Sequence, residues 1–484
     1  MHRAASRLLL GFDEHGEVHD LGHVVHRKIR EDYRDEVAQL HRSYRANNLA
    51  AKGIVETVLR EDGDLEHRKL ITSYPYEWPA NMYKDALLFH LGLFVELDRV
   101  GLTLKDALPN NILFEHTSPV FVDFLSLVPL DKLKDEAWLS ARGYADARFA
   151  VVEKMLMPYM VLPLLFLSRG EYRNARDLLS WRSCNCEGKP PSWSELLRPR
   201  PRRGLRWLRS YVLSLVIAAG LLPARLGNRT KVAEAFQVLM KSLIRRVQAV
   251  DVTPPSSDYS SYYDEKKEAL SLGDPTVLPP KQKTVSDILR ARAPQSVLDI
   301  GANTGWYSVL AASLGASVIA LEEDESCVDI LYAHARRQAL RILPLKVSFG
   351  DLRKEIHAAR ALAPAYRDRG IGENALYRAG TERLGADLVL VLGLVHHLVL
   401  GAGNSIDDVF EVLQRLSGKT LVLEFVALED EKIRDAPEFF PSLRKFDAAS
   451  YNLQRVLEAG RRHFASVDIR ASHPATRTIL VFDK

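Results

Sequence analysis

Residues 296–308 read Ser-Val-Leu-Asp-Ile-Gly-Ala-Asn-Thr-Gly-Trp-Tyr-Ser. The apolar residues on either side of Asp299 predict a strand that is covered on both faces, as strands of parallel sheets are. Gly301 and Gly305 then allow a sharp turn and leave room for a ligand beside the backbone. Asp299 is expected at the carboxyl end of the strand, where open α/β sheets bind their ligands.

A second apolar run, Val-Ile-Ala-Leu at 318–321, ends in Glu322, Glu323 and Asp324. A carboxylate that closes the second strand is placed to accept hydrogen bonds from both hydroxyls of a ribose. The glycine loop lacks the Gly-Lys-Ser/Thr of a phosphate loop and has only two glycines, so it is a poor dinucleotide motif. These features together indicate a nucleoside ligand without a pyrophosphate.

The loop and the acidic strand end resemble motif I of class I S-adenosylmethionine-dependent methyltransferases, over roughly residues 255–484. The resemblance implies that S-adenosylmethionine is the cofactor. It also implies that an acid after the third strand bonds the adenine amino group while its neighbour packs on the ring, although the acid at 351 has the alternative role of a helix cap. The cofactor-binding residues expected on this basis are Asp299, Gly301, Asn303, Gly305, Glu322, Asp351 and Leu352.

The resemblance implies an α/β fold for this part, a seven-stranded, doubly wound, Rossmann-like methyltransferase domain. Further apolar runs fit its strands at 343–348, 386–392 and 421–426, with an antiparallel closing pair at 466–472 and 477–482. His396 and His397 follow the fourth strand, and either imidazole is a candidate to take a proton from an oxygen or nitrogen acceptor. The alternative is that a histidine only shapes the pocket. No metal is expected.

The composition is that of an ordinary soluble protein long enough for two or three domains, with 484 residues, 47% hydrophobic and 26% charged. A net charge of +4 does not by itself argue for nucleic acid, and no DNA partner is expected. The three cysteines, at 184, 186 and 327, show no disulfide framework or metal-binding pattern, which favours a cytoplasmic location. The most apolar run, 211–222, is shorter than the ~20 residues of a membrane-spanning helix.

The N-terminal part, residues 1–190, is expected to be an α+β domain. Residues 104–114 read Leu-Lys-Asp-Ala-Leu-Pro-Asn-Asn-Ile-Leu-Phe, and 120–124 read Val-Phe-Val-Asp-Phe. These stretches resemble the catalytic loop and metal-binding aspartate of protein kinases and small-molecule phosphotransferases. The resemblance implies that Asp106 orients an acceptor hydroxyl and that Asn111 and Asp123 hold magnesium. An ion pair between Lys28 and Glu36 is expected by the same analogy.

Several kinase features are missing. No Gly-x-Gly-x-x-Gly loop precedes Lys28, and Leu104-Lys105 stands where His-Arg or His-Gly is usual before Asp106. Without the phosphate-cradling glycines, half of the phosphoryl-transfer machinery is absent. A degenerate, kinase-like scaffold is therefore the favoured interpretation, with an active bifunctional kinase and methyltransferase, or a non-catalytic binding module, as alternatives.

Residues 191–254 are expected to form a basic, helical connector before the methyltransferase domain begins at 255. Six arginines between Arg198 and Arg209 precede the apolar run 212–222. A membrane-surface or RNA contact through Arg198–Arg209 is the less favoured interpretation. A solvated basic linker that leads into a buried helix explains the same pattern.

The chain as a whole resembles a group of bacterial class I methyltransferase-like proteins, some of them labelled as nodulation proteins. Residues 354–384 depart from the pattern expected there, so the resemblance does not carry the substrate over. The sequence predicts a cytoplasmic methyltransferase acting on an unidentified small-molecule, glycan-like or lipid-linked acceptor. The stretches that carry the likeness are 73–78, 104–106, 299–305, 395–398 and 424–426.

Overall fold

The computed structural model describes residues 7–13, 15–135, 146–179, 232–260, 278–354, 356–357, 375–435, 437–440 and 451–484. The chain forms two compact units: unit 1 is Met1–Pro254 with Ile356–Tyr377, and unit 2 is Pro255–Glu355 with Arg378–Lys484. Part of the divergent stretch 354–384 thus groups with unit 1, although it lies within the sequence of unit 2. The arginine cluster Arg198–Arg209 and the cysteines at 184 and 186 lie outside the described residues.

Unit 2 is built on one seven-stranded sheet. Its strands, in spatial order, are β12 (Ile342–Lys346), β11 (Ser317–Glu322), β10 (Ser296–Ile300), β15 (Ala386–Val391), β16 (Ser417–Val426), β18 (Arg477–Asp483) and β17 (Ser466–Ala471). The first five are parallel, and β18 runs antiparallel to both of its neighbours. The chain steps outward from β10 to β12 and then returns to β15 on the other side of β10. The strand order therefore reverses between β10 and β15, the point at which such sheets bind ligands.

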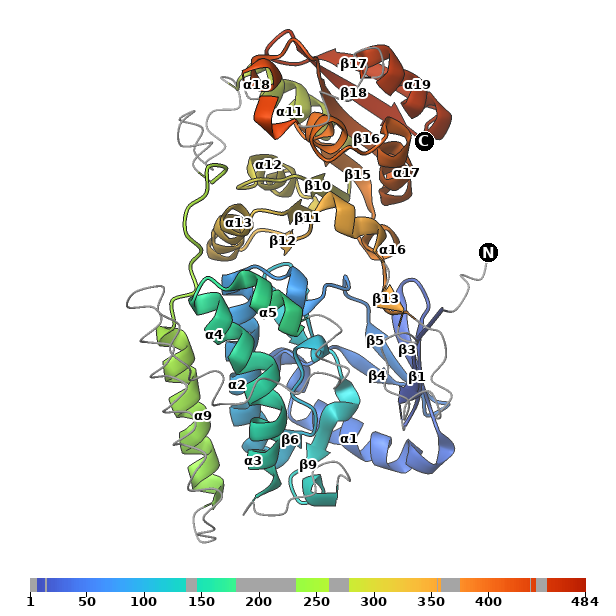
Figure 1. Ribbon diagram of the computed structural model, residues 1–484. Helices are drawn as coiled ribbons and strands as arrows, with labels where there is room; N and C mark the ends of the chain where they lie inside the picture. The colour runs from blue at the N-terminus through green and yellow to red at the C-terminus, as the bar shows by residue number, and fades with distance from the viewer. Residues whose placement is uncertain are drawn as a thin grey trace. The chain divides into compact units, whose positions relative to one another are not determined.

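Helices cover both faces of this sheet (Figure 1). One face carries α11 (Pro280–Arg292), α12 (Trp306–Ser313) and α13 (Glu325–Arg337), whose apolar residues share a core with the strands. The other carries α16 (Gly380–Arg383), α17 (Ile406–Leu416) and α19 (Leu453–His463). On that side the Phe482 ring of β18 lies 5.4 Å from Phe410 and 5.6 Å from Phe464. Coverage of both faces explains why the central strands are apolar throughout.

Unit 1 begins with a five-stranded antiparallel sheet. Its spatial order is β1 (Arg7–Asp13), β2 (Gly16–Asp20), β3 (Val24–Ile29), β5 (Leu65–Arg68) and β4 (Thr57–Leu59). Helix α1 (Arg34–Ala46) follows β3, and the long helix α2 (Ala80–Asp98) follows β5. The chain then continues through β6 (Leu102–Leu104), η4 (Pro109–Asn111), β7 (Ile112–Glu115), β8 (Ser118–Phe121), η5 (Phe124–Ser126) and β9 (Leu127–Pro129).

The rest of unit 1 is helical, with α3 (Ala147–Val151), η8 (Val152–Val161), α4 (Leu162–Ser168), α5 (Tyr172–Leu179) and α9 (Val232–Ala249). Among the described residues, Ala147–Ser168 is long and apolar enough to cross a membrane, but 67% of its apolar window is buried in the protein, as in a core helix. Helix α9 belongs to the same core, because the Phe236 ring lies 6.0 Å from Phe94 and 5.6 Å from Phe149. The described part of the expected connector is therefore a packed helix of unit 1.

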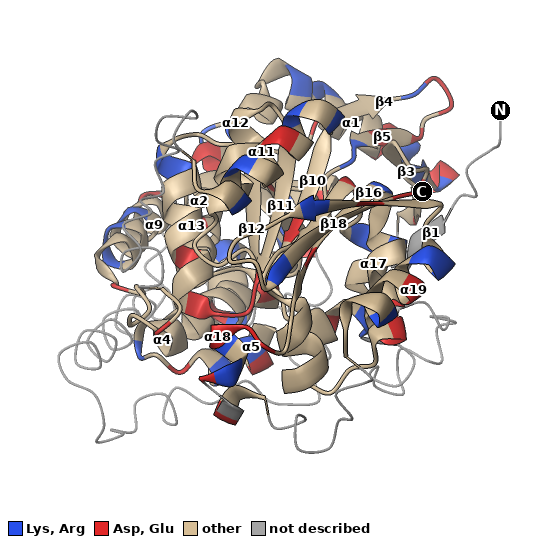
Figure 2. Ribbon diagram, turned by 90° about the horizontal axis from the view of Figure 1, so that it is seen from above, with Lys and Arg blue, Asp and Glu red and all other residues tan. Residues whose placement is uncertain are grey.

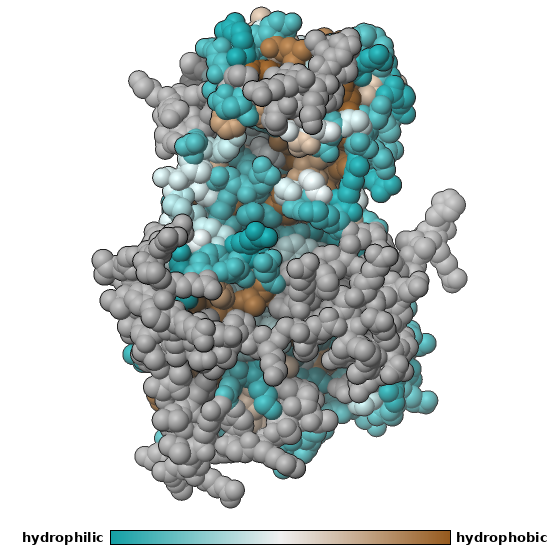
Figure 3. Space-filling view, in the orientation of Figure 1, coloured by the Kyte–Doolittle hydropathy of each residue, from teal (hydrophilic) through white to brown (hydrophobic). Residues whose placement is uncertain are grey.

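The charged residues of unit 2 are mixed rather than segregated. Figure 2 shows lysine and arginine interspersed with aspartate and glutamate along α17 and α19. Hydrophobic surface appears in Figure 3 as limited areas among hydrophilic residues. Such mixing is typical of a solvated surface. The large hydrophobic residues exposed on unit 2 are Tyr259, Leu314, Ile330, Phe439 and Ile469.

Candidate functional site

The loop after β10 is fixed by its backbone conformation and by bonds to the neighbouring strand. Gly301, Asn303 and Gly305 have positive φ angles of 75°, 53° and 94°. The amides of Gly301 and Ala302 donate to the carbonyl of Leu321, at 2.9 and 3.0 Å. The loop therefore lies against the carboxyl end of β11 in one defined shape.

The Cβ positions of the two glycines are bordered by leucine side chains. A Cβ on Gly301 would come within 3.2 Å of a Leu394 methyl carbon, and one on Gly305 within 2.3 Å of a Leu331 methyl carbon. Both residues also adopt the left-handed conformation that favours glycine. Their role is thus to shape the loop, whose backbone is what a ligand would meet.

Glu322 ends β11 and is held by three backbone amides. Its Oε2 accepts from Asn303 N at 2.7 Å, and its Oε1 accepts from Glu323 N at 2.8 Å and from Asp324 N at 2.9 Å. Burial raises the pKa of Glu322, and these donors partly offset the rise. A carboxylate offers about four acceptor positions, so the three bonds fix its orientation and leave capacity for a hydroxyl. Asn303 and Glu322, both expected at the cofactor, are brought together.

Asp299 faces into the protein and not toward a ligand at the sheet edge. It is 2% exposed, and Ser308 Oγ of α12 donates to its Oδ2 at 2.6 Å. Burial raises the pKa of Asp299 to about 6, with Ser308 opposing that rise. The carboxyl group therefore anchors α12 to β10 beneath the loop, and its influence on a ligand is electrostatic.

A buried ion pair closes the site on the side of β16. Lys281 Nζ of α11 lies 2.6 Å from Glu424 Oε2, and Ser472 Oγ donates to Glu424 Oε1 at 2.7 Å. Glu424 is completely buried, whereas the Lys281 side chain is 20% exposed. The structure therefore places the Glu424 carboxylate inside the protein and not at a solvent-exposed strand end. A Cβ on Gly393, in the loop after β15, would lie 3.6 Å from Glu424 Oε2.

His396 and His397 lie side by side after β15, with ring centroids 4.2 Å apart. Phe440 packs against both, at 5.6 and 5.2 Å. Burial lowers the pKa of His396 to about 3, and burial also lowers the pKa of His397. Because a general base works best when its pKa is near the working pH, His396 is the weaker base and His397, which is more exposed, the better candidate.

Asp351 and Leu352 occupy η11 (Phe349–Arg353) and differ sharply in environment. Leu352 is completely buried, and a Cβ on Gly380 would come within 2.6 Å of it. Its side chain is thus a core residue, not one open to an adenine ring. Asp351 is exposed and accepts from Ser348 Oγ at 2.7 Å, and Lys354 also bonds its carboxylate. Those partners compete with an adenine amino group for the carboxylate.

The three kinase-like residues of unit 1 converge. Burial raises the pKa of Asp106 to about 6; the charge of Asp123 adds to the rise, and the nearby Asn111 side chain opposes it. Asp106 Oδ1 also accepts from the amide of Leu108 at 3.1 Å, so it shapes its own turn as the scaffold interpretation requires. Arg27 completes the group, with its guanidinium 3.2 Å from Asp123 Oδ1.

The expected ion pair between Lys28 and Glu36 is wrong. Lys28 is exposed, and Glu36 pairs with Lys132 at 3.2 Å. Arg27, one position earlier on β3 and 5% exposed, is the inward-facing cation. Successive residues of a strand point to opposite faces of the sheet, so a shift of one position replaces a buried side chain by an exposed one.

Sequence reasoning missed four polar residues of the site in unit 2: Lys281, Thr304, Ser308 and Ser472. Thr304 lies in the loop after β10, is 3% exposed, and its Oγ1 has no hydrogen-bond partner among the described residues. The Nδ1 atom of His396 is likewise buried without a hydrogen-bond partner among the described residues. Thr304 and Ser308 both lie within the stretch 296–308, so their positions were usable signals, whereas Lys281 and Ser472 come from segments far away in sequence.

No protein-family model matches this chain. Nodulation protein NoeA of Rhizobium meliloti (strain 1021) is 27% identical over 378 residues, covering 75% of this chain and 70% of NoeA. This agrees with the likeness to nodulation-type proteins.

Solved structures match parts of the chain. WbdD, described as a bifunctional kinase-methyltransferase, matches at 18% identity and a TM-score of 0.26 over 44% of this chain, and the chain spans 42% of WbdD. An O-methyltransferase from Bacillus cereus in complex with SAH matches at 15% identity and a TM-score of 0.27, over 48% of this chain and 92% of that one. TM-scores near 0.3 do not establish a shared fold. The strand order of unit 2, with its antiparallel closing pair, is the feature that assigns it to the class I methyltransferase fold.

Proposed function

We propose that this chain, whose unit 2 has the strand order of the class I methyltransferase fold, transfers a methyl group from S-adenosylmethionine. The observation that carries the proposal is the Glu322 carboxylate, which three backbone amides hold at the end of β11. It lies one strand from the reversal point between β10 and β15. A carboxylate fixed in this way is suited to accept hydrogen bonds from the two hydroxyls of a ribose.

The donor set of the site fits this cofactor. Glu322 would hold the ribose, and the buried hydroxyl of Thr304 is a further polar group without a partner among the described residues. The negative charges of Asp299 and Glu322 favour a ligand that carries positive charge, whereas the charge of Glu424 is offset by Lys281. When bound, the cofactor supplies an electrophilic methyl group, so the protein's part is to align the acceptor and exclude water.

The acceptor is a neutral small molecule, glycan-like or lipid-linked, that presents a hydroxyl or amine near the loop after β15. His397 is placed to take its proton, because it is partly exposed and a lowered pKa keeps it neutral at physiological pH. His396 and Phe440 both pack against that ring.

The test is calorimetric titration of the full-length protein with S-adenosylhomocysteine, followed by transfer of a labelled methyl group. We expect one site per chain in unit 2, and label transferred to carbohydrate or lipid fractions of a bacterial extract. An absence of S-adenosylhomocysteine binding would remove the proposal. Binding without transfer to any fraction would leave a cofactor-binding module in place of an enzyme.

A second function is supported by the convergence of Asp106, Asn111 and Asp123 beside Arg27 in unit 1. Two carboxylates and an amide oxygen are suitable ligands for magnesium, and a buried guanidinium suits a phosphate group. Unit 1 would then bind a magnesium–nucleotide complex. Asp123 would have to exchange its bond with Arg27 for the metal, which weakens this proposal relative to the first.

Replacing Asp123 by Asn tests nucleotide binding in unit 1. We expect the wild-type chain to bind ATP with magnesium in calorimetry, and the variant to bind about tenfold more weakly or worse, because a metal-ligating charge is lost. Glu61→Gln removes one exposed carboxylate from the turn between β4 and β5 and serves as the control. If the wild-type chain binds no ATP, or if both variants bind alike, unit 1 is a scaffold.

A further inference from the structure

Tyr259 lies in a turn that is locked by its own serines. Ser257 N donates to Ser260 Oγ at 2.9 Å, Ser260 N donates to Ser257 Oγ at 3.1 Å, and Ser260 Oγ donates to the carbonyl of Ser257 at 2.8 Å. Ser260 is 8% exposed. These reciprocal bonds fix the backbone on both sides of Tyr259, so the position of its side chain is set by the turn.

The same turn is tied to the candidate cofactor site. Asn303 Nδ2 donates to the carbonyl of Tyr259 at 3.2 Å, while Asn303 N donates to Glu322 Oε2 at 2.7 Å. One residue thus links the backbone of Tyr259 to the carboxylate assigned to the ribose. Because Asn303 has a φ of 53°, its amide and its side chain are held in this arrangement by the loop conformation.

The phenol ring lies among acidic groups and remains half exposed. Burial raises the pKa of Tyr259, and the charges of Glu323, Glu322 and Asp324 add to the rise in that order. The phenol is therefore neutral at physiological pH and lies near the acidic end of β11. Tyr259 is nevertheless 51% exposed, which is unusual for a large aromatic residue held in so rigid a turn. A half-exposed aromatic ring near a ribose site is suited to cover a flat base or the sugar.

We infer that Tyr259 is a cofactor-binding residue whose ring face covers the nucleoside end of the ligand held by Glu322. This inference rests on the proposed function, because it needs a nucleoside at Glu322. The Tyr259 ring adds a specificity element that the glycine loop lacks. The Cβ positions of Gly301 and Gly305 are bordered by leucine side chains, so these positions present no aromatic surface. A ligand with a flat purine gains from the contact, and one without a base does not.

Three variants of the full-length protein test the inference: Tyr259→Ala, Tyr259→Phe and Ile469→Ala. Ile469, on β17, is also 51% exposed, so its truncation removes a side chain of equal exposure elsewhere on unit 2. The affinities for S-adenosylhomocysteine and for adenosine are measured by calorimetry, and circular dichroism confirms folding. We expect Tyr259→Ala to lower the affinity for both ligands by the same factor, roughly tenfold to hundredfold. Tyr259→Phe should stay within about threefold of wild type, as should Ile469→Ala.

Equal affinities for wild type and Tyr259→Ala would overturn the inference while leaving the methyltransferase assignment intact. A Phe variant as weak as the Ala variant would also overturn it, because the hydroxyl rather than the ring face would then make the contact. Failure of the wild-type chain to bind either ligand is a different result and sinks the proposed function itself.

Discussion

Glu322→Gln should weaken the binding of S-adenosylhomocysteine about 100-fold. The substitution removes the negative charge that two ribose hydroxyls would share, and hydrogen bonds to a charged group contribute about 1.5–3 kcal/mol. It also turns an amide NH₂ group toward a backbone donor, either Asn303 N at Oε2 or the paired amides of Glu323 and Asp324 at Oε1. Two donors facing each other repel, so the loop loses its anchor together with its ligand.

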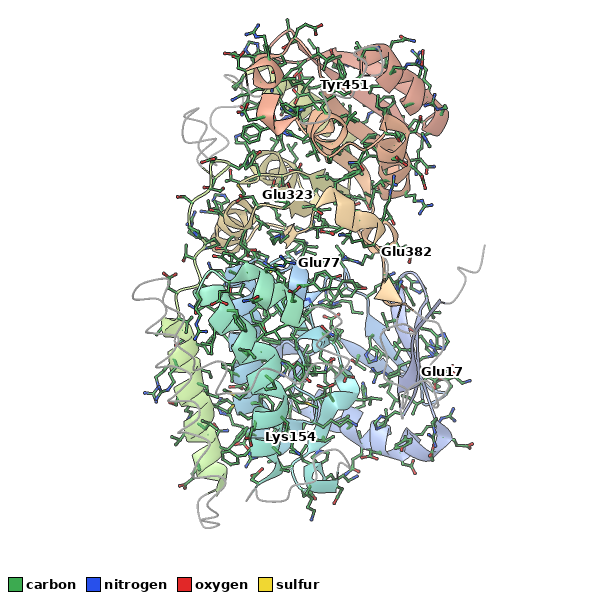
Figure 4. The ribbon with its side chains drawn as sticks, in the orientation of Figure 1. Glu17, Glu77, Lys154, Glu323, Glu382 and Tyr451 are labelled. Atoms are coloured by element: carbon green, nitrogen blue, oxygen red, sulfur yellow. The ribbon has the colours of Figure 1, made fainter. Side chains whose placement is uncertain are left out.

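Glu323→Gln is the matched control, because it removes the same charge one residue further along the chain. Glu323, labelled in Figure 4, is exposed where Glu322 is partly buried. Its substitution should change the affinity by less than about threefold, since an exposed charge is screened by solvent. Calorimetry on both variants measures the two affinities for S-adenosylhomocysteine. Equal losses would mean that the acidic end of β11 acts through its overall charge and that Glu322 holds no ribose.

Gly305→Ala should lower the free energy of unfolding of unit 2 by ~2–5 kcal/mol. Two costs combine at this position. A φ of 94° costs an L-residue about 1–2 kcal/mol, and the added methyl would lie 2.3 Å from Leu331 Cδ1, an overpacking that costs about 1–3 kcal/mol. Leu331 is completely buried in α13, so it has little space into which to move. The measurement is urea denaturation followed by a probe within unit 2.

Gly315→Ala separates the two costs. Gly315 has nearly the same φ, 98°, but nothing lies within 4 Å of its Cβ position. The Gly315→Ala variant should lower the free energy of unfolding by only about 1–2 kcal/mol, because backbone strain is its single cost. The double variant Gly305→Ala with Leu331→Ala should lose less free energy of unfolding than the two single variants lose together. The reason is that shortening Leu331 relieves its clash with the added methyl group. If Gly305→Ala and Gly315→Ala are equally destabilising, the packing of Leu331 on the loop is not what requires glycine.

The sequence by itself determined the local elements of unit 2. The apolar run before Gly301 is β10, and the run that ends at Glu322 is β11. The closing pair lies at Ser466–Ala471 and Arg477–Asp483, within one residue of its expected limits. These features depend on periodicity and turn chemistry, which neighbouring residues set among themselves.

In unit 1 the motif positions along the chain were predictable from the sequence, but the residues that face inward were not. Asp106, Asn111 and Asp123 converge as the motif spacing predicts, yet the cation beside them is Arg27 and not Lys28. The choice depends on which face of β3 is covered by the rest of the unit. The sequence of β3, Val-Val-His-Arg-Lys-Ile, does not alternate between apolar and polar residues, so it does not show which face is covered.

Only the tertiary structure decided which partners the polar groups of the site have. Asp299 bonds Ser308, nine residues on, while Glu424 bonds Lys281 and Ser472, which are 143 and 48 residues away. It also placed Leu352 in the core and left Tyr259 half exposed. Such contacts form when strands and helices distant in sequence pack together. The neighbours of a buried carboxylate set its pKa and the groups that it can bind. They are therefore properties of the folded chain and cannot be read from any single stretch of the sequence.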